Sequence, residues 1–106
     1  MIMKSREFEE RIKELGYEYS CDTQEIEVGI IVEYARTKEG RTLLCVSNSY
    51  EFDIDTAWGA FESMGLEKQD ELFYLFYLYA RTPIHKRGLR INKKEVTNHE
   101  FSIDRD

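Results

Sequence analysis

The sequence predicts a single α+β domain, in which an N-terminal helix and a long aromatic helix pack on an antiparallel sheet of three or four strands. Three patterns support this prediction: an amphipathic helical segment near the N-terminus, period-two alternation through the middle of the chain, and nine consecutive apolar or aromatic residues before Pro83. The 106 residues are 42% hydrophobic and 34% charged, which is typical of one globular domain spanning residues 1–106.

The first helix is predicted over residues 6–15. Its apolar residues fall at positions i, i+4 and i+7: Phe8, Ile12 and Leu15. We expect Ser5 to cap the start of this helix, and Gly16 to end it in a left-handed conformation with Tyr17 just beyond.

Strands are predicted to follow as a meander. A short strand is expected over residues 17–21. From Glu25 the apolar side of the next strand consists of Ile26, Val28, Ile30, Val32 and Tyr34, with Glu33 on the polar side. Residues 37–41 form a hairpin loop with Gly40 at positive φ, and residues 42–48 return with Leu44 and Val46 on one face. A third candidate strand covers residues 50–55, where Tyr50, Phe52 and Ile54 alternate with acids.

Residues 56–66 are interpreted as a loop or one irregular turn, because Gly59 and Gly65 weaken a helix. The aromatic helix is expected to follow the polar turn 67–70 and to stop at Pro83. Its main apolar stripe consists of Leu72, Leu75, Phe76 and Tyr79.

The aromatic helix is apolar on every side, yet it is far shorter than the roughly 20 residues that span a bilayer. Its second side must therefore be covered either by the rest of the domain or by a second copy. The homodimer hypothesis places the seam at Phe73, Tyr74 and Tyr77.

The net charge of −6 is unevenly distributed. Residues 1–80 hold 17 acids and 8 bases, which gives −9, whereas residues 81–106 hold 4 acids and 7 bases, which gives +3. Met1-Ile2-Met3 is followed at once by charged residues, so we expect no signal peptide and a cytoplasmic protein. Cys21 and Cys45 are then expected to be reduced core residues rather than a disulfide or a metal site.

Seven acids lie within residues 51–71, opposed by Lys68 alone. Such a surface could enter a groove built for nucleic-acid phosphates on another protein. The predicted partner-binding residues are Glu51, Asp53, Asp55, Glu62, Glu67 and Asp70. Glu51, Asp53 and Asp55 could instead hold Mg²⁺ or Ca²⁺, but a solvated strand face explains them more simply.

The alternative hypothesis is a nucleic-acid-binding regulator that uses the basic segment after the aromatic helix. Its candidate phosphate contacts are Arg81, Lys86, Arg87, Arg90, Lys93 and Lys94. No aromatic residue is interleaved among these bases to stack on nucleobases. Residues 84–106 form this basic C-terminal segment, and Phe101 and Ile103 alternate with polar residues as an edge strand would.

Catalysis is not predicted. None of the common nucleotide-binding, metalloprotease or hydrolase motifs is present, and no local pattern pairs either cysteine with His85 or His99. We therefore expect a non-enzymatic protein without a cofactor or metal ion.

Three stretches of the sequence resemble small accessory proteins of phages and prophages of Gram-positive bacteria. They are Glu7 to Tyr17, Ala60 to Ser63, and Glu71 to Arg87, of which Tyr79 to Ile84 is the most specific. Tyr74 stands where relatives are expected to carry an acid, and the sequence after Lys86 departs from their pattern. The resemblance implies a phage protein acting inside a bacterium by binding a host or defence protein, for example as an anti-CRISPR-like inhibitor. It transfers no catalytic residue.

Overall fold

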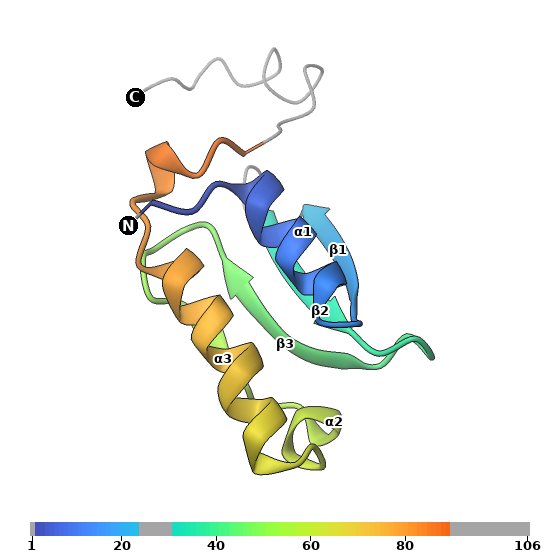
Figure 1. The fold of residues 1–106 in the computed structure, drawn as a ribbon. Coiled ribbons are helices and arrows are strands. Elements are labelled where there is room, and N and C mark those ends of the chain that lie inside the picture. The colour runs from blue at the N-terminus through green and yellow to red at the C-terminus, as the bar shows by residue number, and fades with distance from the viewer. Residues whose placement is uncertain (1, 24–30, 90–106) are drawn as a thin grey trace.

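The computed structural model describes residues 2–23 and 31–89 and has the predicted α+β fold (Figure 1). Helix α1 (Ser5–Glu14) is followed by strands β1 (Glu18–Thr23), β2 (Ile31–Arg36), β3 (Thr42–Ser47) and β4 (Ile54–Asp55). Helices α2 (Gly59–Glu62) and α3 (Leu66–Ala80) and the 3₁₀ turn η1 (Ile84–Lys86) complete the described chain. The four strands form an antiparallel meander in the order β1-β2-β3-β4, as the sequence predicts.

Helix α1 confirms the predicted first helix, with one difference at its start. Phe8 and Ile12 are fully buried, and Gly16 ends the helix at φ 98°, while the Tyr17 N–H donates to the Ile12 carbonyl. Ser5 does not cap the helix as predicted. It is the first helical residue, and its hydroxyl donates to Glu33 at 2.8 Å instead.

Both long helices pack on the same face of the sheet. Phe8 of α1 stacks on Tyr79 of α3 at 4.1 Å between ring centroids and meets Phe76 edge-on at 4.8 Å. Leu44 and Val46 of β3 are fully buried beneath these helices, as predicted. This aromatic and aliphatic layer is the core of the domain.

In strand β2, the side chains that face the core are the alternate set to the one predicted. Glu33 and Ala35 pair in register with Val46 and Leu44, so Glu33 points into the core and is fully buried. Val32 and Tyr34, expected on the core side, lie on the other face of the sheet. The alternation is correct, but the pattern alone does not reveal that Glu33 has buried partners. The candidate core residues Ile26, Val28 and Ile30 lie outside the described residues.

The third predicted strand is mostly a loop. Only Ile54–Asp55 pairs with β3, while Tyr50 and Phe52 are exposed in the preceding turn. Phe52 has a φ of 64°, which is incompatible with a continuous strand.

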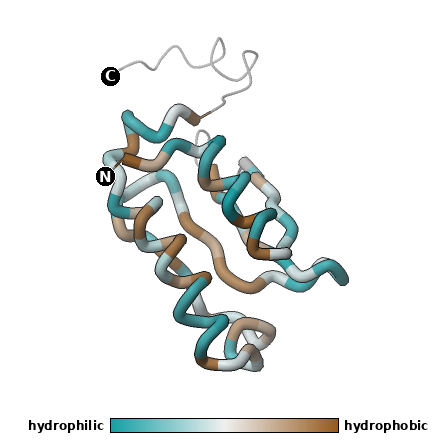
Figure 2. Tube along the Cα trace, in the orientation of Figure 1, coloured by the Kyte–Doolittle hydropathy of each residue, from teal (hydrophilic) through white to brown (hydrophobic). Residues whose placement is uncertain are grey.

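Helix α3 starts five residues earlier than predicted, because residues 67–70 continue the helix instead of forming a turn. It ends at Ala80, shortly before Pro83, and its predicted stripe is buried: Leu72, Leu75, Phe76 and Tyr79. Figure 2 shows that the helix changes from hydrophilic residues near α2 to hydrophobic residues near its C-terminal end. Its opposite side, with Phe73, Tyr74 and Tyr77, is exposed in the described structure.

The remaining connections are short. The segment 56–66, predicted as a loop or irregular turn, contains the four-residue helix α2, and Ala60, Phe61 and Met64 pack against the core. Residues 84–86 form a 3₁₀ turn rather than an edge strand. The other candidates for that strand, Phe101 and Ile103, lie outside the described residues.

Candidate protein-interaction surface

The six predicted partner-binding acids are all solvent-exposed. We call this set (Glu51, Asp53, Asp55, Glu62, Glu67 and Asp70) the acidic surface. None of its members takes part in the ion pairs found within residues 2–23 and 31–89. By contrast, acids of α1 and β1 are neutralised, for example Glu7 by Arg11 at 3.0 Å and Glu18 by Lys38 at 3.1 Å. No ion pair in the described residues therefore neutralises the negative charge of the acidic surface.

The acidic surface extends along α3 rather than gathering at one point. Its first members lie where the chain leaves β3, and there the Phe52 N–H donates to the carbonyl of Ala80 at the end of α3. Its last members lie at the other end, where Gln69 of α3 donates to the Phe61 carbonyl of α2. With 1.5 Å of rise per residue, the two ends are about 20 Å apart. The acids therefore fall into two groups, one near each end of α3.

Exposed aromatic side chains accompany these acids. Tyr74 is 61% exposed, Phe52 is 61% exposed and Tyr50 is 72% exposed. The Tyr77 ring lies 6.4 Å from Tyr74 and 6.2 Å from Phe52, so that these rings form a continuous aromatic patch. Exposed aromatic residues surrounded by charged residues are typical of protein–protein interfaces.

Phe52 is held in a strained backbone conformation. Among non-glycine residues in the described chain it alone has a positive φ, and the left-handed region costs an L-residue about 1–2 kcal/mol. The loop is fixed at both sides, because the Phe52 N–H donates to Ala80 and the Glu51 carboxylate accepts the Ile84 N–H at 3.0 Å. In this conformation the Phe52 ring is exposed and lies beside Tyr77.

The basic segment is only partly available for phosphate contacts. Arg81 and Lys86 are exposed, and the Arg81 guanidinium lies 5.7 Å from the Tyr77 ring centroid. Arg87, predicted as a phosphate contact, is fully buried, which corrects that prediction. Three further candidates lie outside the described residues: Arg90, Lys93 and Lys94.

Arg87 organises the end of α3 instead. Its guanidinium donates to the carbonyls of Ala80 at 2.7 Å and Thr82 at 2.9 Å, and to the side-chain oxygen of Asn48 at 2.6 Å. It also lies over the Tyr79 ring, 4.9 Å from the centroid. Burial lowers the pKa of Arg87, while the nearby Tyr79 and Glu33 oppose that shift. The carbonyls left free at the end of α3 are the reason for an arginine here.

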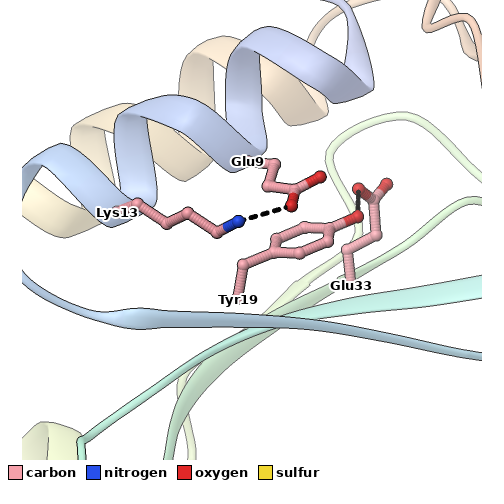
Figure 3. Close-up of polar contacts among 4 residues, drawn as sticks. All are labelled: Glu9, Lys13, Tyr19 and Glu33. Carbon is pink, nitrogen blue, oxygen red and sulfur yellow. Dashed lines mark hydrogen bonds and ion pairs between the residues drawn. The ribbon is translucent and has the colours of Figure 1, made fainter.

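Glu33 lies at the centre of a buried polar network. One carboxylate oxygen accepts hydrogen bonds from Ser5 at 2.8 Å and from Tyr19 at 2.6 Å, and the other accepts from Asn48 at 3.0 Å and from the Tyr79 hydroxyl. Figure 3 shows the Tyr19 ring extending beneath α1 to reach Glu33, below the Glu9–Lys13 pair. Four donors satisfy this carboxylate, so its burial is compatible with a stable fold.

The buried titratable groups do not suggest a reactive site. Burial is the largest cause that raises the pKa values of Tyr19 and Tyr79, and the charge of Glu33 is the second. Both phenols therefore stay protonated. Burial also raises the pKa of Cys45 to about 11 and raises that of the exposed Cys21, so neither is an activated thiolate. Cys45 fits the predicted core role, whereas Cys21 does not. Within the described ranges, no three acids, histidines or cysteines are grouped to hold a metal ion.

Sequence reasoning missed two contributors to the candidate surface, Leu66 and Phe52. Leu66 and Asp70 recur with Phe73, Tyr77 and Arg81 at helical spacing on the exposed side of α3. That periodicity is present in the sequence and was concealed by the expectation of a turn at residues 67–70. The exposed position of Phe52 had no comparable signal, because its residue type suggested a strand.

Comparison of the chain with protein-family models, with curated proteins and with solved structures found no significant match. In the described part of the chain, α3 and the other helices are too short or too polar to cross a membrane. The geometry and charge of this surface are therefore the features that point to a function.

Proposed function

We propose that this protein is a non-enzymatic binding protein that modulates or inhibits another protein through the acidic surface. The observation that carries this proposal is the exposure of six carboxylates without ion pairs, next to a patch of exposed aromatic rings. Aromatic rings supply the buried contacts of an interface, and charged residues at its rim select the partner and speed association.

The chemistry of the surface favours a cationic partner. Carboxylates accept charge-assisted hydrogen bonds from arginine and lysine, and two groups of exposed acids about 20 Å apart can contact the bases that line a groove for nucleic-acid phosphates. The resemblance to phage accessory proteins supports a bacterial host or defence protein as the partner. An anti-CRISPR-like inhibitor that occupies the nucleic-acid groove of a nuclease is the specific form of this hypothesis.

Affinity capture from a bacterial lysate tests the proposal. The variant Asp53→Lys, Glu62→Lys reverses two exposed acids that take part in no ion pair described above. We expect the wild-type chain to retain a nucleic-acid-binding protein and this variant to lose it by about tenfold or more, because attraction becomes repulsion. Raising the salt concentration should release the same protein.

The matched control is Glu14→Lys, Glu39→Lys, which reverses two exposed acids on α1 and in the β2–β3 hairpin. Each reversal adds +2, so both double variants change the net charge from −6 to −2. If the control loses the partner equally, the binding depends on overall charge and not on the acidic surface. If both variants retain it, the acidic surface is not the binding site.

A further inference from the structure

The exposed side of α3 carries a single stripe of residues that no other described element covers (Figure 1). We call the α3 stripe the set Leu66, Asp70, Phe73, Tyr74, Tyr77 and Arg81. Steps of three or four residues place these side chains on one side of a helix. Four of them are large apolar or aromatic side chains with exposures of 36% to 73%.

The two ends of the stripe differ in a way that matters for pairing. At the C-terminal end, Arg81 lies over Tyr77, and Phe52 from the neighbouring loop extends the apolar surface beyond the helix. At the N-terminal end, Leu66 is 73% exposed and is followed by the exposed acids Glu67 and Asp70. One end therefore offers an aromatic ring and a cation, and the other offers an aliphatic side chain and anions.

We propose that the α3 stripe binds a second copy of this chain, with the two α3 helices antiparallel and the two-fold axis beside Tyr74. Around that axis, a residue that lies a given number of positions before Tyr74 faces the partner's residue that lies about the same number of positions after Tyr74. Arg81 of one protomer then meets the partner's Glu67, and Tyr77 meets the partner's Asp70 or Glu71. Phe52 covers the partner's Leu66, and the two Tyr74 rings pack together at the centre.

Charge complementarity selects this arrangement over the alternatives. Antiparallel pairing joins each basic end to an acidic end, and it also opposes the two helix dipoles. Parallel pairing would place Arg81 against Arg81 and Asp70 against Asp70, which is repulsive. The surface is thus complementary to itself under a two-fold operation, which is the requirement for a closed dimer.

This inference goes beyond the proposed function but shares Glu67, Asp70 and the exposed aromatic rings with it. Glu51, Asp53, Asp55 and Glu62 of the acidic surface lie outside the α3 stripe, so a dimer presents two copies of them. The double variant Asp53→Lys, Glu62→Lys should dimerise normally even if partner capture fails. Failure of either proposal is therefore distinguishable from failure of the other.

Sedimentation equilibrium of the full chain tests the dimer. We expect the wild-type chain to be dimeric at roughly 100 µM, above the micromolar Kd typical of a small interface. Tyr74→Glu places two like charges at the axis and should give monomers, whereas Tyr50→Glu, at an equally exposed tyrosine outside the stripe, should leave the dimer intact. A wild-type monomer at that concentration overturns the proposal.

A charge swap tests the antiparallel geometry. Arg81→Glu and Glu67→Arg should each raise the dimer Kd by about tenfold or more, since each creates two like-charge contacts. The double variant should restore the wild-type Kd, because the swapped pair attracts again. Residues 67 and 81 are about 20 Å apart within one protomer, so restoration can only arise between protomers. Additive weakening in the double variant would overturn the antiparallel arrangement.

Discussion

At the scale of single residues, Glu33 shows how a carboxylate can belong to a core. Its four donors come from α1, β1, the loop after β3, and α3, so that one side chain connects most of the described elements. Asn48 then links Glu33 to Arg87, because its amide nitrogen donates to the carboxylate and its oxygen accepts from the guanidinium. The network is polar, buried and satisfied, which makes each member sensitive to replacement.

Tyr79→Phe removes one donor from Glu33 while leaving the ring stacked on Phe8. We expect the free energy of unfolding to fall by about 1.5–3 kcal/mol, the range for a hydrogen bond to a charged group. Tyr74→Phe makes the same chemical change on the exposed side of α3 and should alter stability by less than about 0.5 kcal/mol. Urea unfolding of the three proteins measures both values, and equal effects would contradict the role assigned to Glu33.

At the scale of elements, the loop between β3 and β4 combines a strained backbone at Phe52 with an exposed Phe52 ring. Phe52 adopts a conformation that asparagine tolerates better, and two hydrogen bonds to the end of α3 hold the loop there. A residue that is both strained and exposed is not explained by packing. Its position beside Tyr77 suggests that its contribution is made in a complex.

Phe52→Asn should therefore stabilise the protomer and weaken the dimer. We expect the free energy of unfolding to rise by about 1 kcal/mol as the strain is relieved. The dimer should dissociate more readily, because the ring that covers the partner's Leu66 is lost. Chemical denaturation and sedimentation of the same variant measure the two effects, and a loss of both stability and association would contradict this interpretation.

Most elements could be predicted from local patterns, because helix α1, the β2–β3 hairpin and the buried stripe of α3 depend on periodicity within a few residues. The errors occur where a distant residue decides the outcome. The side of β2 that faces the core depends on the hydrogen bonds that Ser5 and Tyr79 donate to Glu33. The burial of Arg87 depends on the carbonyls that it binds at the end of α3. Neither relationship has a local signal in the sequence.

At the scale of the whole molecule, the candidate surface could be predicted only in part. The acids of residues 51–71 can be identified from the sequence because they are clustered with few bases among them. Their exposure is expected because unpaired charged side chains are seldom buried. Their grouping at the two ends of α3, and the addition of Phe52 to the aromatic patch, depend on how the loop folds back on the helix. These relationships are properties of the tertiary structure.

Alkaline pH should destabilise the whole molecule. The pKa values of Tyr19 and Tyr79 are raised in the folded protein, so the folded state keeps protons that the unfolded chain begins to lose near pH 10. The contribution of the two tyrosines to stability is therefore complete below pH 10 and falls as the pH rises above it, by about 1.4 kcal/mol per pH unit for each tyrosine. Cys45, whose pKa is about 11 instead of 9, adds to this fall from pH 9 upward.

Denaturation curves collected from pH 8 to pH 11.5 measure this dependence. Tyr79→Phe lacks one phenol whose pKa is raised by the fold and should show a shallower decline than the wild type above pH 10. Tyr74→Phe should follow the wild type. A wild-type stability that stays constant to pH 11.5 would mean that the phenols are not held protonated by the fold.

The buried position of Glu33 also has a consequence for how the chain matures during synthesis. Glu33 emerges from the ribosome after its donors Ser5 and Tyr19 but before Asn48 and Tyr79, and until those two emerge, one of its carboxylate oxygens can be satisfied only by water. The emerging sheet cannot close over an unpaired charge. Nearly all of the described sequence must therefore be translated before the domain can fold. Folding is then a late, cooperative step.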